Sequence, residues 1–194
     1  MKKLLLNCAL AALAGSFFMS CNSAGTSRNS DTTAAVQSSP AAAATTASTV
    51  MNNILQQYYK LHDAMVEADV PAADSAAARL KASLESLPLA DLQQDTAAAG
   101  KIRSSLESIR GELDGLQGEQ QIKGKRQEFS MVSDMMYDLV KAAHPAGIKT
   151  YHQFCPMAFE GKGAYWLSSN ADIRNPYYGH DMLNCGEVKD TLSY

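Results

Sequence analysis

Soft metal donors occur in two short stretches near the C-terminus. Cys155 and Met157 lie two positions apart, and Met182 and Cys185 lie three positions apart. Residues two apart on an extended strand project to one face, and residues three apart share a face of a helical turn. If the segment folds back on itself, two thiolates and two thioethers converge. Such a donor set selects Cu(I), whereas zinc favours Cys with His and calcium favours oxygen.

Two histidines, His152 and His180, stand close to the two stretches and could serve as auxiliary ligands. The residues fit two other interpretations as well. A Cys155–Cys185 disulfide would close a loop and contribute about 3–4 kcal/mol in the chain-entropy model. Alternatively, the thiols are simply buried and the methionines fill a core. The pattern alone leaves the metal site, the disulfide and the buried thiols open.

The N-terminus has the features of an export signal. Lys2 and Lys3 precede an apolar stretch, LLLNCALAALAGSFFM, that is too short to span a bilayer comfortably. Ser20 and Cys21 follow it, and this order resembles the lipobox of bacterial lipoproteins. The resemblance implies that residues 1–20 are a signal peptide, and that Cys21 carries lipid and anchors the protein in a membrane.

Export changes the cysteine count of the finished protein. Cys8 leaves with the signal and Cys21 carries lipid, so Cys155 and Cys185 remain. A lone pair in an oxidising compartment is a disulfide candidate. Asn22 follows the lipidated cysteine where Asp would favour inner-membrane retention. The resemblance to lipoproteins therefore implies the outer membrane, with the protein on its periplasmic side.

The rest of the chain divides into a tether and one domain. Residues 21–47 are rich in Ser, Thr and Ala, and cannot bury enough apolar surface to fold, so we expect a flexible tether. Residues 48–194 are expected to form the domain. After Pro145 the chain becomes rich in Gly, Pro, Asn and Tyr. There we expect TYHQFCPMAF and GAYWL to pair as a hairpin, NPYYG to form a turn, and HDMLNCGEV to hold one helical turn.

Helical spacing dominates residues 48–143. Ser48 or Thr49 can cap the first predicted helix, Asp69 is a typical helix start, Pro88 a typical stop, and His144-Pro145 closes the last helix. Short connections between helices of similar length predict a mainly α fold, an antiparallel, up-and-down four-helix bundle with an irregular C-terminal segment. The apolar stripes recur at steps of three and four. They comprise Val50, Ile54, Tyr58, Leu61 and Met65; Ala73, Ala76, Ala77, Leu80, Leu84 and Leu87; Ile102, Leu106, Ile109, Leu113 and Leu116; and Ile122, Phe129, Val132, Met136, Leu139 and Val140.

Composition and motifs argue against several functions. A net charge of −3 gives no basic face, so we expect no nucleic-acid partner. No Ser-His-Asp grouping can be inferred and no phosphate-binding loop is present, so we expect no enzyme. The basic run KGKR, residues 123–126, is interpreted as a solvated helix face.

The C-terminal motif carries a resemblance. YHQFCPMAFEGKGAYWLSSNADIRNPYYGHDMLNCGEV resembles the terminal motif of a bacterial domain of unknown function, and YYKLHDAMVEAD is similar to that family's first helix. The resemblance covers about residues 50–192. The family occurs in small exported lipoproteins and at the C-terminal end of periplasmic adaptor subunits of copper and silver efflux pumps. The motif is also similar to the YxCPMHP…CG segments of copper transporters, but Ala158 and Phe159 replace the His-Pro.

The resemblance implies copper handling. We therefore expect a membrane-tethered periplasmic protein that binds or buffers Cu(I) through Cys155, Met157, Met182 and Cys185, in association with an efflux-pump adaptor or another envelope protein. The alternative is a helical interaction domain of the cell envelope that binds no metal. In that case a Cys155–Cys185 disulfide staples the C-terminal segment.

Overall fold

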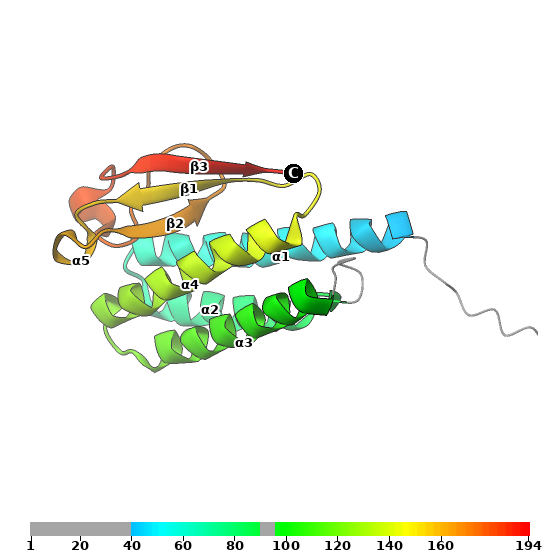
Figure 1. Ribbon diagram of the computed structural model, residues 1–194. Helices are drawn as coiled ribbons and strands as arrows, with labels where there is room; N and C mark the ends of the chain where they lie inside the picture. Colours follow the sequence, from blue (N-terminus) through cyan, green and yellow to red (C-terminus); the bar gives the residue numbers. More distant parts are fainter. Residues whose placement is uncertain (1–39, 90–95) are drawn as a thin grey trace, which may run out of the picture. The chain divides into compact units, whose positions relative to one another are not determined.

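The computed structural model describes residues 40–89 and 96–194 (Figure 1). The predicted signal peptide, Cys21 and most of the predicted tether lie outside the described residues. Within the described residues, no helix is both long enough and apolar enough to cross a membrane. The elements follow in the order α1 (Pro40–Val66), α2 (Val70–Glu85), α3 (Thr96–Gly118), α4 (Ile122–Ala143), β1 (Lys149–Cys155), α5 (Ala158–Gly161), β2 (Ala164–Ser168), η2 (Gly179–Met182) and β3 (Glu187–Ser193).

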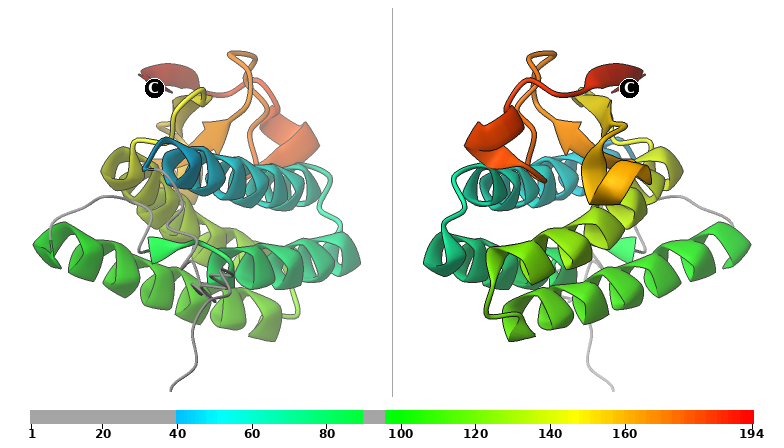
Figure 2. Two further views of the ribbon diagram at one scale, coloured as in Figure 1. Left: turned by 90° about the vertical axis from the view of Figure 1, so that its right-hand side faces the viewer. Right: turned by 90° about the vertical axis from the view of Figure 1, so that its left-hand side faces the viewer.

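The four long helices confirm the predicted bundle. Short connections reverse the chain between α1 and α2 and between α3 and α4, and each helix packs mainly on the partner across its connection. Figures 1 and 2 show α1 and α4 in the layer beneath the strands and α2 and α3 in the layer beyond it. The predicted stripes form one core: all but two of their residues are buried, and Val50 and Ile122 pack on its edge. Each helix therefore buries its apolar face against the others.

The ends of the helices largely follow the sequence signals. The Asp69 side chain caps α2 by accepting a hydrogen bond from the Ala72 backbone N–H at 2.9 Å. His144, in the left-handed conformation, ends α4 just before Pro145. The start of α1 differs from the prediction, because the helix begins at Pro40 rather than near Ser48. The last part of the predicted tether is therefore helical, and neither Ser48 nor Thr49 caps α1.

Three antiparallel strands form a sheet in the order β2-β1-β3. The predicted β1–β2 hairpin is confirmed, with Cys155 opposite Ala164 across the turn that contains α5. The sequence analysis assigns no particular strand after Gly186, and there β3 pairs with β1, from Lys149↔Ser193 to Phe154↔Glu187. The C-terminal segment is thus more regular than expected.

The sheet is fixed to the helices by buried polar contacts as well as by packing. The Tyr58 hydroxyl of α1 lies 2.7 Å from Ser133 Oγ of α4 and accepts a hydrogen bond from the Leu167 backbone N–H of β2 at 3.1 Å. Next to it, the Tyr59 hydroxyl donates to Thr150 Oγ1 of β1 at 2.9 Å. Burial raises the pKa of Tyr58, so its hydroxyl stays neutral in this contact. These contacts set the position of β1 and β2 over α1 and α4.

Lys125 corrects the interpretation of KGKR as a solvated helix face. Its side chain is fully buried, and its ammonium donates to Asp74 Oδ1 at 2.5 Å and to the Leu116 carbonyl at 2.8 Å. One lysine on α4 therefore joins α2 and α3. A buried charge is tolerated when it is paired and hydrogen-bonded, as this one is.

Candidate functional site

The two cysteines of the C-terminal segment lie side by side. Cys155 ends β1, and Cys185 lies just before β3. Both are free thiols, with 3.1 Å between their Sγ atoms. The pairing of β1 with β3 explains the meeting, since Phe154 and Glu187 stand opposite each other at the end of that ladder. Either a disulfide or a metal ion shared by two sulfurs is compatible with this arrangement.

The pair has one buried and one accessible side. Cys155 is fully buried, whereas Cys185 is partly exposed. Gly186 makes the close approach possible, because its φ is +150° and a Cβ there would lie 2.8 Å from the Trp166 ring and 2.9 Å from the Phe154 carbonyl oxygen. A metal ion or an oxidant would therefore reach the sulfurs from the side of Cys185.

Asn175 holds the loop that carries Cys185. It is fully buried; its side-chain amide donates to the Cys185 carbonyl at 2.8 Å, and its backbone N–H donates to the Leu183 carbonyl at 2.8 Å. Its side-chain oxygen accepts from the backbone N–H groups of Tyr177 and Tyr178 at 2.8 and 3.3 Å. The predicted NPYYG turn is confirmed, since the Gly179 backbone N–H donates to the Asn175 carbonyl at 3.0 Å, but the sequence analysis did not connect Asn175 with Cys185.

The two thiols share a hydrogen bond, and this contact affects the ionisation of Cys185. The hydrogen bond to Cys155 is the main cause that raises the pKa of Cys185, with burial acting in the same direction. A hydrogen bond with the Met157 backbone acts in the opposite direction. Without a bound cation, the Cys185 thiol therefore tends to keep its proton.

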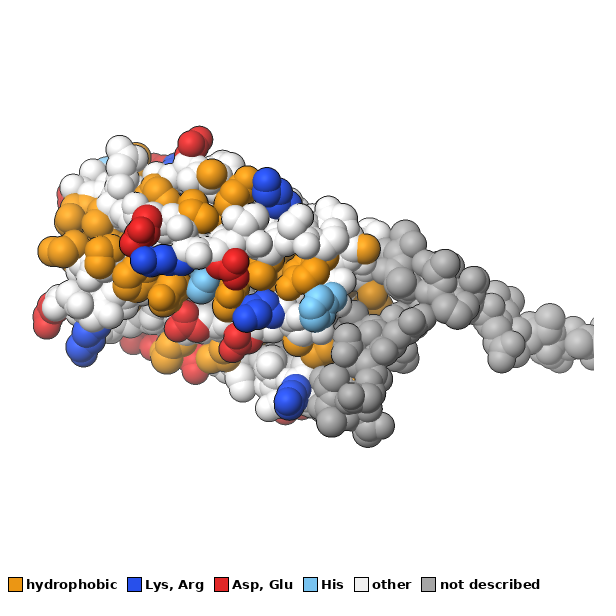
Figure 3. Space-filling model, turned by 45° about the horizontal axis from the view of Figure 1, so that its top comes forward, with side chains coloured by type: hydrophobic (Ala, Val, Ile, Leu, Met, Phe, Trp, Pro, Cys, Tyr) orange, Lys and Arg blue, Asp and Glu red, His pale blue; other side chains and the backbone are white. Residues whose placement is uncertain are grey.

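Both predicted methionine ligands are exposed beside the cysteines in the chain. Met157 is 51% exposed and Met182 is 38% exposed. Figure 3 shows apolar side chains gathered at the end of the molecule where α5 and η2 lie. The backbone N–H of Cys185 donates to the Met182 carbonyl at 3.0 Å, which closes the predicted helical turn. The strand ends at Cys155, so the expected alternation does not extend to Met157, whose backbone is helical (φ −86°, ψ −14°).

His152 is held away from the thiols. It lies on the face of β1 opposite to Cys155, because successive strand residues alternate. Its ring stacks between Tyr137 and Tyr165, with centroid distances of 3.8 and 4.5 Å. Its Nε2 is buried without a hydrogen-bond partner, and burial lowers the pKa of the imidazole. His152 therefore acts as a core residue in this structure.

His180 is engaged elsewhere. Its Nε2 lies 2.8 Å from Oε2 of Glu67, just past the end of α1. Within residues 40–89 and 96–194, no three His, Cys, Asp or Glu side chains gather in a way that could hold a metal ion. A metal at the cysteine pair would thus depend on the two thiolates and on thioether sulfur.

Comparison with known proteins finds a match to one protein family. Residues 54–147 match the model of a family described as a protein of unknown function (DUF3347). No curated protein and no solved structure matches the chain. The match spans α1 to α4 from Ile54 and ends before β1, so it does not include the cysteine pair. Over residues 54–147 this chain is therefore similar to the DUF3347 family, a domain of unknown function.

Proposed function

We propose that the protein binds or buffers a soft metal ion, copper as Cu(I), through Cys155 and Cys185. One observation carries the proposal: the two sulfurs are 3.1 Å apart, and one of them is accessible from solvent. Two thiolates favour soft ions, and thioethers are further soft donors. Met157 and Met182 are exposed on the segments that carry the cysteines, so they supply thioether sulfur with little competition from packing.

The donor set argues for copper over zinc. A structural zinc site needs four ligands, commonly Cys and His, and neither His152 nor His180 is available beside the sulfurs. Cu(I) is served by sulfur alone. The raised pKa of Cys185 fits a thiol that keeps its proton until a metal ion displaces it.

We place this activity in the cell envelope. The apolar N-terminal stretch and Cys21 support a lipid-anchored protein on the periplasmic side of the outer membrane. The resemblance of the C-terminal motif supports association with a copper or silver efflux system through its adaptor subunit. In this role the protein would hold Cu(I) outside the cytoplasm and pass it to the pump.

A competition titration tests the metal proposal. The reduced chain is titrated without air against a chromogenic Cu(I) chelator, alongside Cys155→Ser and Cys185→Ser. We expect one tightly bound Cu(I) in the wild type, and its loss in both serine variants. Met157→Leu and Met182→Leu should weaken binding, whereas the control Met131→Leu, at an exposed methionine on α4, should not. Unchanged affinity in Cys155→Ser would refute the proposal.

The second candidate is a helical interaction domain stapled by a Cys155–Cys185 disulfide. The same contact favours it, because sulfurs 3.1 Å apart need only a small movement to form the bond. In this case the protein isolated under native, non-reducing conditions has no free thiol and no metal. Thiol titration together with metal analysis on protein prepared without air separates the two candidates.

A further inference from the structure

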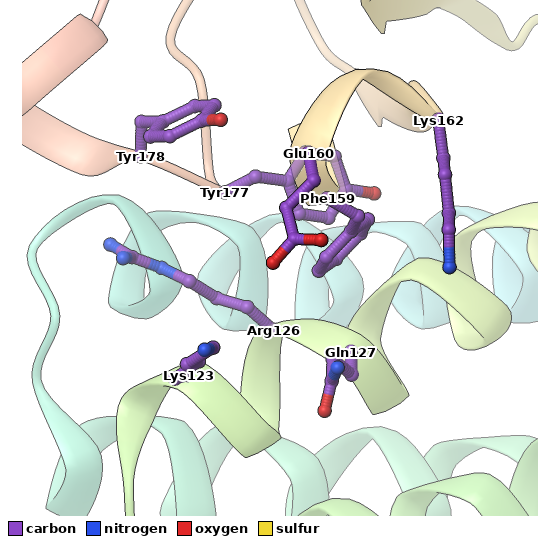
Figure 4. A pocket seen from close by; sticks show the side chains of 8 residues that line it. All are labelled: Lys123, Arg126, Gln127, Phe159, Glu160, Lys162, Tyr177 and Tyr178. Atoms are coloured by element: carbon purple, nitrogen blue, oxygen red, sulfur yellow. The ribbon is translucent and has the colours of Figure 1, made fainter. Parts of the chain in front are cut away.

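A pocket of about 460 Å³ lies on the α4 side of the C-terminal segment, apart from the two sulfurs. The first turns of α4 form its floor, the α5 turn covers it, and the tyrosines before η2 close one side (Figure 4). Its volume falls in the range of small-molecule sites. The lining residues are Lys123, Arg126, Gln127, Phe159, Glu160, Lys162, Tyr177 and Tyr178.

The pocket is positively charged in a chain that carries a net charge of −3. Lys123, Arg126 and Lys162 contribute three positive charges and Glu160 one negative charge, which leaves a balance of 3 − 1 = +2. Among the described residues, no carboxylate forms an ion pair with Lys123 or Lys162, whereas Lys81, Arg110 and Arg174 each pair with a carboxylate elsewhere on the molecule. Both ammonium groups are therefore available to an anion.

Arg126 has hydrogen-bonding capacity left over. One of its terminal nitrogens donates to the Met65 carbonyl at 2.9 Å, but its Nε is buried and has no partner. An unpaired buried N–H group costs free energy that a ligand could recover. Asp181 is the acidic group whose charge acts on the guanidinium, and Glu160 reaches into the same space without forming an ion pair with it (Figure 4).

The aromatic residues offer ring surface rather than hydroxyl groups. The Tyr177 hydroxyl already donates to the Tyr165 carbonyl, and the Tyr178 hydroxyl donates to the Met157 carbonyl at 2.6 Å. Phe159 is held over the pocket by an uncommon backbone, since Phe159 and Glu160 both have positive φ, 51° and 62°. Strained non-glycine backbone of this kind is enriched at ligand sites.

We propose that this pocket binds a small organic anion, one with a phosphate or carboxylate group and an apolar part the size of one ring. The two lysines and Arg126 would hold the anionic group, and the rings of Phe159, Tyr177 and Tyr178 would contact the apolar part. The pocket uses neither cysteine, so this proposal does not depend on metal binding.

A titration of the full mature chain tests the proposal. The probes are phenyl phosphate, benzoate, inorganic phosphate and the neutral benzyl alcohol, and binding is followed by amide chemical shifts. We expect saturable shifts at Lys123, Gln127 and Tyr178 with phenyl phosphate or benzoate, weaker binding of inorganic phosphate, and none of benzyl alcohol. The stronger of the two ring anions identifies the preferred head group, and its affinity should fall with added salt.

Charge variants provide the control. Lys123→Gln and Lys162→Gln each remove one exposed charge from the pocket and should each weaken binding about two- to fivefold, as expected for partly solvated charge pairs. Lys101→Gln makes the same change at an exposed lysine on α3 that does not line the pocket, and it should leave affinity unchanged. The proposal is overturned if no anion gives saturable shifts at these residues, if benzyl alcohol binds as well as the anions, or if Lys101→Gln weakens binding as much as the pocket variants.

Discussion

The cysteine pair allows the difference in stability between the oxidised and the reduced protein to be worked out. Cys155 and Cys185 are 30 positions apart, and β1 and β3 already hold them together. In the chain-entropy model the unfolded chain loses about 2.1 + 3.0 ln 30, or about 12 cal/mol/K, when the loop is closed, which corresponds to about 3.6 kcal/mol at 25 °C. We therefore expect the disulfide form to be more stable than the reduced form by about 3–4 kcal/mol.

Urea unfolding of the two forms measures this difference. One sample is oxidised until no free thiol remains, and the other is kept reduced without air. The variant with both Cys155→Ser and Cys185→Ser is the matched control, and its unfolding midpoint should not depend on reductant. Equal stability of fully oxidised and fully reduced wild type, within about 0.5 kcal/mol, would contradict the loop argument. The same shift in the double serine variant would show that the effect has another origin.

Cu(I) should raise the stability of the reduced form in a different way. A ligand that binds the folded state contributes RT ln(1 + [L]/Kd), or about 4 kcal/mol at a thousandfold excess over Kd. This gain depends on metal concentration, whereas the gain from the disulfide does not. The unfolding midpoint of reduced protein at several Cu(I) concentrations therefore distinguishes a metal site from a staple.

Three further predictions concern the surrounding fold. Asp74→Ala leaves the Lys125 ammonium buried with a single carbonyl partner and should lower the unfolding free energy by about 2–3 kcal/mol, less than for a fully buried pair because Asp74 is 40% exposed. Lys125→Met removes the buried charge itself and should lower it by under about 1 kcal/mol. Equal losses of the two variants in urea unfolding would contradict this account. Because the pKa of His152 is lowered in the folded state, the unfolded chain binds a proton below about pH 6.5 that the folded chain does not. The unfolding free energy should therefore decrease as the pH falls, by up to about 1.4 kcal/mol per pH unit. His152→Phe should lose this part of the pH dependence of unfolding, and an unchanged pH profile in that variant would refute the argument. Gly186→Ala places a methyl group 2.8 Å from Trp166 and should lower the unfolding free energy by about 1–3 kcal/mol, measured by thermal unfolding. The control is Gly147→Ala, whose methyl group would meet no atom within 4 Å, so it shows the cost of positive φ without a clash.

The helices could be predicted because their signals are local. The α2 and α3 stripes are buried throughout, and Asp69 caps α2 as its residue type suggests. Their spacing needs no knowledge of the partner surface, since a 3.6-residue period indicates a helix by itself. The hairpin could be predicted for the same reason, because both of its strands and its turn lie within a few residues of one another.

The missed features depend on distant partners. Strand β3 is exposed except at Leu192, so its sequence has little apolar alternation, and only pairing with β1 makes it a strand. From its sequence context Lys125 is expected at the surface, because nothing nearby in the chain indicates its contact with Asp74 on another helix. The same limit applies to His152, because Tyr137 of α4 and Tyr165 of β2 create its stacked environment. Chain neighbours carry no signal for such contacts.

The strand order also has a consequence for the timing of assembly. β1 lies in the centre of the sheet, and its second neighbour, β3, is the last element of the chain. Pairings between residues so far apart in sequence form late, after the local helical contacts. In the exported protein that we propose, the two sulfurs would therefore meet only after β3 has left the secretion channel and paired with β1. Until then the chain would present two separate thiols, so either a disulfide or a metal site would form only once the sheet is complete.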